Sequence, residues 1–180
     1  MIVNSASIKL LIYNKGKSDI KDGVAMPQIN PKSSSQFEWY SMIEKAKIIS
    51  GYNFSDSVQH YLVLTLRHFT TKKDLASKVL AIDFLTHSEM NTVNDQRSIR
   101  DLGDHCLVLS GLFPERIIKK NISLNYVIGI GKQSYRLLST ANSPSVKYID
   151  QKLFSHLDMN FVGLMDLLNH IRLDAYSHSI

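Results

Sequence analysis

FSHLDMNFVGLMDLLNHIRLDA, residues 154–175, is the stretch that decides the fold class. Its apolar residues recur in alternating steps of three and four, which places them along one face of an α-helix. They are Phe154, Leu157, Phe161, Leu164, Leu168, Ile171 and Ala175. Ser143 and Pro144 precede the stretch as a predicted cap and first helical residue. We therefore expect one long C-terminal helix, the longest of the chain, with a seam that packs inside a bundle.

The same periodicity predicts five more helices upstream of this one. They cover approximately residues 35–50, 55–69, 71–85, 99–113 and 123–141. Ser35 and Ser55 stand where helix caps are expected, and Pro114 ends or kinks the fourth predicted helix. Residues 35–180 are therefore predicted to form an all-α, single-domain bundle of about six helices.

Residues 1–34 differ from the rest of the chain. Turn signals crowd this segment, among them Asn14, Gly16, Pro27 and Pro31. We expect an irregular or partly disordered N-terminal arm ahead of the bundle.

The composition of the chain excludes several protein classes. It has 180 residues, of which 44% are hydrophobic, and this is ordinary globular usage. The single cysteine, Cys106, excludes an internal disulfide and a cysteine-based zinc site. No apolar run reaches the roughly 18 residues that span a bilayer, and the N-terminus is a poor signal peptide. We expect a cytoplasmic protein that is not embedded in a membrane.

Positive charge is concentrated in two segments of a chain whose net charge is +5. The arm carries five lysines against two aspartates, and residues 114–137 carry five basic residues against Glu115. Those five are Arg116, Lys119, Lys120, Lys132 and Arg136. Such a segment attracts phosphate backbones, so nucleic-acid binding is one hypothesis; the other reading is a solvated helix face.

Five histidines follow an aspartate by four residues. The pairs are Asp56/His60, Asp83/His87, Asp101/His105, Asp166/His170 and Asp174/His178. On a helix this spacing favours local ion pairs. A metal site is the alternative, because carboxylates and imidazoles on facing helices can share an ion. Its four candidate ligands are Asp83, His87, Asp101 and His105. The chain lacks the Glu-x-x-His motif of diiron bundles, and we expect no cofactor.

A ligand pocket or enzyme site between the third, fourth and fifth predicted helices is a further hypothesis. Its candidate residues are Asp104, His105, Glu115, Arg116, Tyr126 and Tyr135. Four glycines on the fourth and fifth helices predict close helix crossings. They are Gly103, Gly111, Gly129 and Gly131. Cys106 falls on the apolar stripe of the fourth helix, so we expect a buried thiol.

LGDHCLVLSGLFPER, residues 102–116, together with Tyr126, Gly131 and Tyr135, resembles a family of small bacterial proteins of proteobacterial type. Its recognisable core is the motif Gly-Leu-Phe-Pro-Glu-Arg, and the resemblance extends from about Tyr61 to the C-terminal helix. It implies an all-α cytoplasmic protein. It implies no reaction, and it carries over no catalytic residue.

The leading functional hypothesis is a non-enzymatic helical protein that acts through protein contacts, including contact with a second copy of itself. The long C-terminal seam motivates it, because one small bundle need not cover such a seam.

Overall fold

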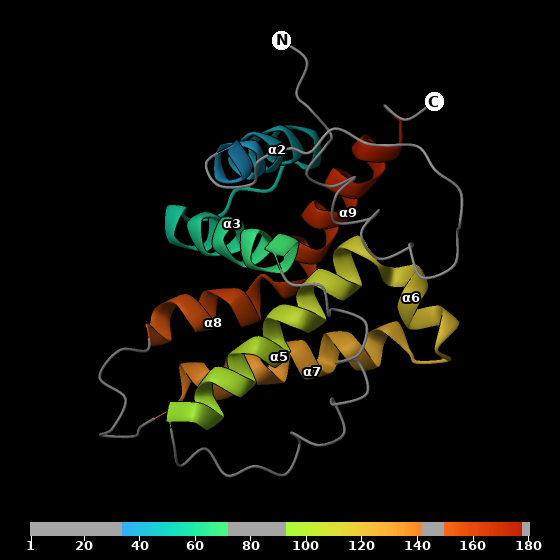
Figure 1. Ribbon diagram of the computed structural model, residues 1–180. Helices are drawn as coiled ribbons and strands as arrows, with labels where there is room; N and C mark the ends of the chain where they lie inside the picture. Colours follow the sequence, from blue (N-terminus) through green and yellow to red (C-terminus); the bar gives the residue numbers. More distant parts are fainter. Residues whose placement is uncertain (1–33, 72–92, 142–149, 178–180) are drawn as a thin grey trace.

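The computed structural model describes residues 34–71, 93–141 and 150–177 (Figure 1). Within these ranges the chain forms seven helices and no strand, so the predicted all-α bundle is confirmed. The helices are α2 (Ser34–Ser50), α3 (Asp56–Thr71), α5 (Val93–Leu112), α6 (Pro114–Lys119), α7 (Leu124–Ser139), α8 (Gln151–Met159) and α9 (Phe161–Ser177). The predicted arm, except for Ser34, and residues 72–85 of the predicted third helix lie outside the described residues.

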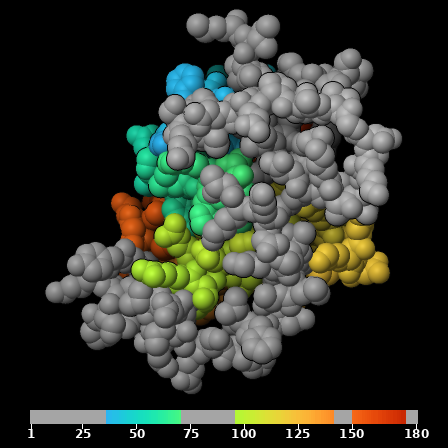
Figure 2. Space-filling model, in the orientation of Figure 1, coloured from blue at the N-terminus to red at the C-terminus, as the bar shows by residue number. Residues whose placement is uncertain are grey.

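The helices are arranged around α5, which packs against α7 on one side and α9 on another. Figure 1 shows α2 and α3 above and the α5–α7 pair below, with α8 between them and α9 rising toward α2. In the space-filling view of Figure 2, the green surface of α3 and the yellow-green surface of α5 meet on one face. Every residue from 102 to 113 is buried, which places the fourth predicted helix at the centre of the bundle.

Three of the four glycines singled out in the sequence lie at close helix crossings. A Cβ on Gly103 would sit 2.7 Å from Cε1 of Tyr135 on α7, and one on Gly111 would sit 2.5 Å from Cβ of Leu168 on α9. A Cβ on Gly131 would meet the Phe161 ring. The prediction is wrong for Gly129, because no described side chain or neighbouring helix lies within 4 Å of the position of its Cβ.

The C-terminal helix is two helices, which corrects the prediction of one long helix. The break is at Asn160, whose backbone N–H and side-chain Nδ2 both donate to the carbonyl of His156. Asp150 caps α8 by accepting from the backbone N–H of Leu153, whereas Ser143 and Pro144 lie outside the described residues. The twenty-residue α5 is the longest described helix. The break lets α8 follow α7 while α9 turns to lie against α5 and α2.

The six seam residues from Phe154 to Ile171 are nevertheless all buried within the chain. The seam therefore needs no partner to cover it, and this argument for self-association is removed.

α2 has apolar residues on two faces rather than one. Trp39 and Ile43 are fully buried, but Phe37 and Ile49 are exposed. After α5 ends at Leu112, Pro114 begins the short helix α6, which the periodicity did not predict. In the part of the chain that the structure describes, no helix combines the length and apolarity that crossing a membrane requires.

Candidate functional site

A buried carboxylate joins three helices at the centre of the bundle. Oδ1 of Asp104 on α5 accepts hydrogen bonds from the hydroxyls of Tyr61 on α3, at 2.7 Å, and Tyr135 on α7, at 2.8 Å. Nε of Arg100 lies 3.8 Å from Oδ2 of the same carboxylate, and its guanidinium stands over the Tyr61 ring. Phe154 on α8 packs against both tyrosine rings.

Burial dominates the electrostatics of this cluster. It raises the pKa of Asp104 to about 6, against the opposing effect of the two tyrosine hydrogen bonds and of Arg100. Burial, followed by the charge of Asp104, raises the pKa of Tyr61 and Tyr135 well above the usual value. Both hydroxyls therefore remain donors at neutral pH. Because both hydroxyls donate to the Asp104 carboxylate, the cluster is a structural network that links helices.

Only two of the six predicted pocket residues converge, namely Asp104 and Tyr135. The imidazole of His105 packs edge-on against Phe69, and its Nδ1 bonds to the carbonyl of Asp101. Glu115 accepts from Arg172 at 3.1 Å, and the Arg116 guanidinium stands over the Phe113 ring. Tyr126 is close to half exposed near the start of α7. The structure thus does not assemble these six side chains into one pocket.

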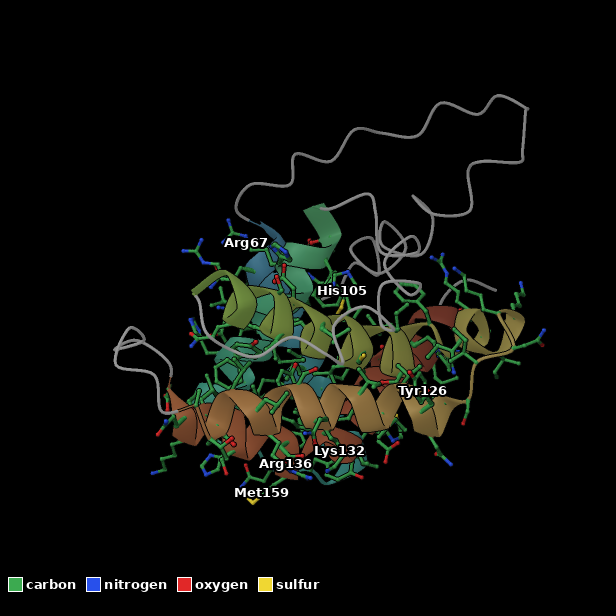
Figure 3. All side chains as sticks on the ribbon, turned by 90° about the horizontal axis from the view of Figure 1, so that it is seen from below. Arg67, His105, Tyr126, Lys132, Arg136 and Met159 are labelled. Atoms are coloured by element: carbon green, nitrogen blue, oxygen red, sulfur yellow. The ribbon has the colours of Figure 1, made fainter. Side chains whose placement is uncertain are left out.

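The basic segment is partly neutralised. Arg136 donates to the carboxylate of Asp158 from Nε at 2.9 Å, and Lys132 Nζ lies 3.5 Å from the same carboxylate and donates to its backbone carbonyl. In Figure 3, Lys132 and Arg136 lie on the opposite side of the α5–α7 pair from His105. Lys119 and Lys120 are exposed at the end of α6. The five cations predicted to bind nucleic acid therefore do not form one free patch.

Two aspartates of the Asp–His pairs have other partners in the structure. Asp166 accepts from the hydroxyl of Tyr52, and Asp174 binds Lys45. Asp83, His87 and His178 lie outside the described residues, so the pairs Asp83/His87 and Asp174/His178 are not tested, and neither is the four-ligand metal site that includes Asp83 and His87. Among the residues that are described, no group of three or more potential ligands could hold a metal ion.

A polar hollow of about 580 Å³ lies between α2 and α3. Glu44 on its wall accepts from Gln59 and from Lys47, and these hydrogen bonds lower the pKa of Glu44. The Tyr40 hydroxyl is hydrogen-bonded to Nδ1 of His60. Most of the polar groups that line the hollow therefore satisfy one another.

The exposed face of α2 contains the least covered apolar side chains in this part of the molecule. Phe37 is 77% exposed and Ile48 is 83% exposed. Between them on the same face lie Ser41 and Glu44, so the four residues follow one another in steps of four, three and four. We call these four residues the α2 seam.

The α2 seam is bordered on one side by α9. Lys45 binds Asp174 at 2.9 Å, and the Tyr52 hydroxyl donates to Asp166 at 3.1 Å, which aligns the two helices in opposite directions. Ile49 is 58% exposed one turn after Lys45, and Leu173 is half exposed two turns after Asp166. These two side chains extend the apolar surface toward α9.

Sequence reasoning missed Tyr61 and Asp158 as partners of predicted residues, and it missed the exposure of the α2 seam. One signal was available for Tyr61: a carboxylate on a helix as apolar as α5 requires buried donors from its neighbours. Comparison with known proteins adds no identification, since no family model, curated protein or solved structure matches the chain. The resemblance to a bacterial family therefore stays a prediction.

Proposed function

We propose that this protein is a non-enzymatic helical protein that acts through contact with another protein at the α2 seam. The observation that carries the proposal is the exposure of Phe37 and Ile48 on a helix whose opposite face already fills the core. Phe37 and Ile48 lie at the two ends of one exposed helix face, and large apolar side chains left in contact with water on such a face mark an interaction surface.

The other groups singled out in the sequence support a structural rather than a catalytic role. Asp104 and Tyr135 bond to each other, and Cys106 is buried with a pKa raised to about 12 by burial. A thiol in that state is a poor nucleophile. We place the contact in the cytoplasm, where a lone reduced cysteine is usual. The resemblance to a bacterial family that implies no reaction is compatible with this role.

Photo-crosslinking in cells that produce the protein tests the proposal. A benzophenone side chain is placed at position 48 of the full chain, and in a matched control at position 118, where Ile118 is 65% exposed on α6. We expect a discrete protein adduct from position 48 and none from position 118. Absence of any adduct from position 48, or equal adducts from both positions, would contradict the proposal.

A further inference from the structure

We infer that the partner at the α2 seam is a second copy of this chain, packed antiparallel through α2 about a two-fold axis. This inference rests on the proposed function and specifies its partner.

The first argument is the order of residues along the seam. From Phe37 through Ser41 and Glu44 to Ile48, it runs apolar, polar, polar, apolar, and it therefore has the same pattern from either end. A two-fold interface brings the same patch of both copies together, so such a patch must be self-complementary. The α2 seam meets this requirement.

The second argument is what an antiparallel pairing places in contact. With the axis at the midpoint of the seam, Phe37 of one copy faces Ile48 of the other, and Ser41 faces Glu44. Two apolar contacts then form at the ends, and the Ser41 hydroxyl can donate to the Glu44 carboxylate on each side of the axis. Steps of four and three are the spacing with which paired helices interlock their side chains.

The third argument is charge. α2 carries two acidic residues, Glu38 and Glu44, and two basic residues, Lys45 and Lys47, so the helix has no net charge. The chain as a whole is +5, and α7 carries two basic residues and no acidic one. Two copies of a cationic protein repel each other least where the local charge cancels. Between these two helices, the charge favours α2 over α7 as the self-contact.

Disulfide trapping tests the inference. The full chain has one cysteine, and Cys106 is buried, so a cysteine introduced on the seam is a selective probe. Chains carrying Phe37→Cys and chains carrying Ile48→Cys are mixed and mildly oxidised. We expect a covalent dimer in the mixture and little covalent dimer in either variant alone. The reason is that position 37 of one copy lies roughly 16 Å from position 37 of the other, and the same holds for position 48. Ile118→Cys serves as the control and should remain monomeric.

Light scattering of the reduced full chain is the second measurement. We expect concentration-dependent dimerisation, and we expect Ile48→Glu to raise the dissociation constant at least roughly tenfold while Ile118→Glu leaves it unchanged. Circular dichroism checks that both variants remain helical. A monomer at concentrations up to about 1 mM, where even weak complexes form, would overturn the inference. Crosslinking of Ile48→Cys to itself in preference to Phe37→Cys would also overturn it.

The two failures can be told apart. If position 48 crosslinks in cells to a protein other than this chain while the purified chain stays monomeric, the inference of a second copy is wrong, but the proposed contact surface is supported. If position 48 crosslinks to nothing, the proposed function itself fails.

Discussion

The hydroxyl of Tyr135 donates to Oδ1 of Asp104 across 2.8 Å, and this bond ties the middle of α7 to the middle of α5. Tyr61 on α3 donates to the same oxygen, so one carboxylate holds three helices in register. A buried charge is costly unless it is hydrogen-bonded, and the two tyrosines supply those bonds. The pKa of Asp104 nevertheless remains raised by burial, which makes the stability of the fold depend on pH.

Replacing Asp104 with asparagine should remove that dependence. The folded-state pKa of about 6 lies above the ordinary value of 3.8, so the folded chain holds a proton that the unfolded chain loses between pH 4 and pH 6. Stability from this group is therefore present at low pH and is lost as the pH rises through that window. Relative to Asp104→Asn, the wild type should lose roughly 2 kcal/mol of unfolding free energy from pH 4 to pH 6 in urea denaturation.

The matched control is Asp166→Asn, which removes a partly buried carboxylate that also accepts from a tyrosine. This variant retains Asp104 and should keep most of the wild-type slope between pH 4 and pH 6. If the difference in unfolding free energy between the wild type and Asp104→Asn does not change between pH 4 and pH 6, burial does not raise the pKa of Asp104.

Alanine at the two glycines of α7 should have opposite effects on stability. Gly129→Ala should stabilise the chain by up to about 1 kcal/mol, because alanine favours helix and the described residues leave space for its Cβ. Gly131→Ala should destabilise it, because the new Cβ would sit 2.8 Å from Cβ of Cys106 and against Phe161. Chemical denaturation of both variants checks the pair, and a destabilised Gly129→Ala would show that α7 is covered at that point.

Asp158→Asn should release two cations of the basic segment. Arg136 and Lys132 both bind Asp158, whose side chain is largely buried, and the variant should lose about 1 kcal/mol of stability. It should also bind DNA and RNA more tightly than the wild type in fluorescence anisotropy at about 50 mM salt. Equal affinity of variant and wild type would mean that Asp158 does not limit the exposed charge.

The thiol of Cys106 should resist alkylation in the folded chain. It is buried on α5, and burial raises its pKa to about 12, so the thiolate that reacts is scarce and covered. We expect reaction with iodoacetamide to become fast only under unfolding conditions. Rapid labelling of the native chain would contradict the packing of α5 against α7.

The helical character of α5 could be predicted because it follows from apolar periodicity. The break at Asn160 could not, since Phe154, Leu157, Phe161 and Leu164 keep the same periodicity across it. Such an apolar pattern indicates which residues are buried. It does not indicate whether the residues before and after Asn160 pack against the same helix. The packing of α8 on α7 and of α9 on α2 is determined by tertiary contacts and not by the local sequence pattern.

The candidate site was less predictable than the fold. Asp104 and Tyr135 were singled out together, but their third partner, Tyr61, comes from a helix more than forty positions away along the chain. The α2 seam was hidden for a different reason. Phe37 lies about 160° around the helix from Trp39, so apolar residues occur on both sides of α2, and only the position of the core shows which side faces water.

Methyl NMR of the full chain over a dilution series tests the α2 contact most directly. With isoleucine δ1-methyl groups labelled, the Ile48 signal should shift as the concentration rises, because the Phe37 ring of a second copy then stands over it. The Ile118 signal, from an exposed isoleucine on α6, should not move. An Ile48 signal that stays constant over the whole series, or an Ile118 signal that moves with it, would contradict contact between two copies at the α2 seam.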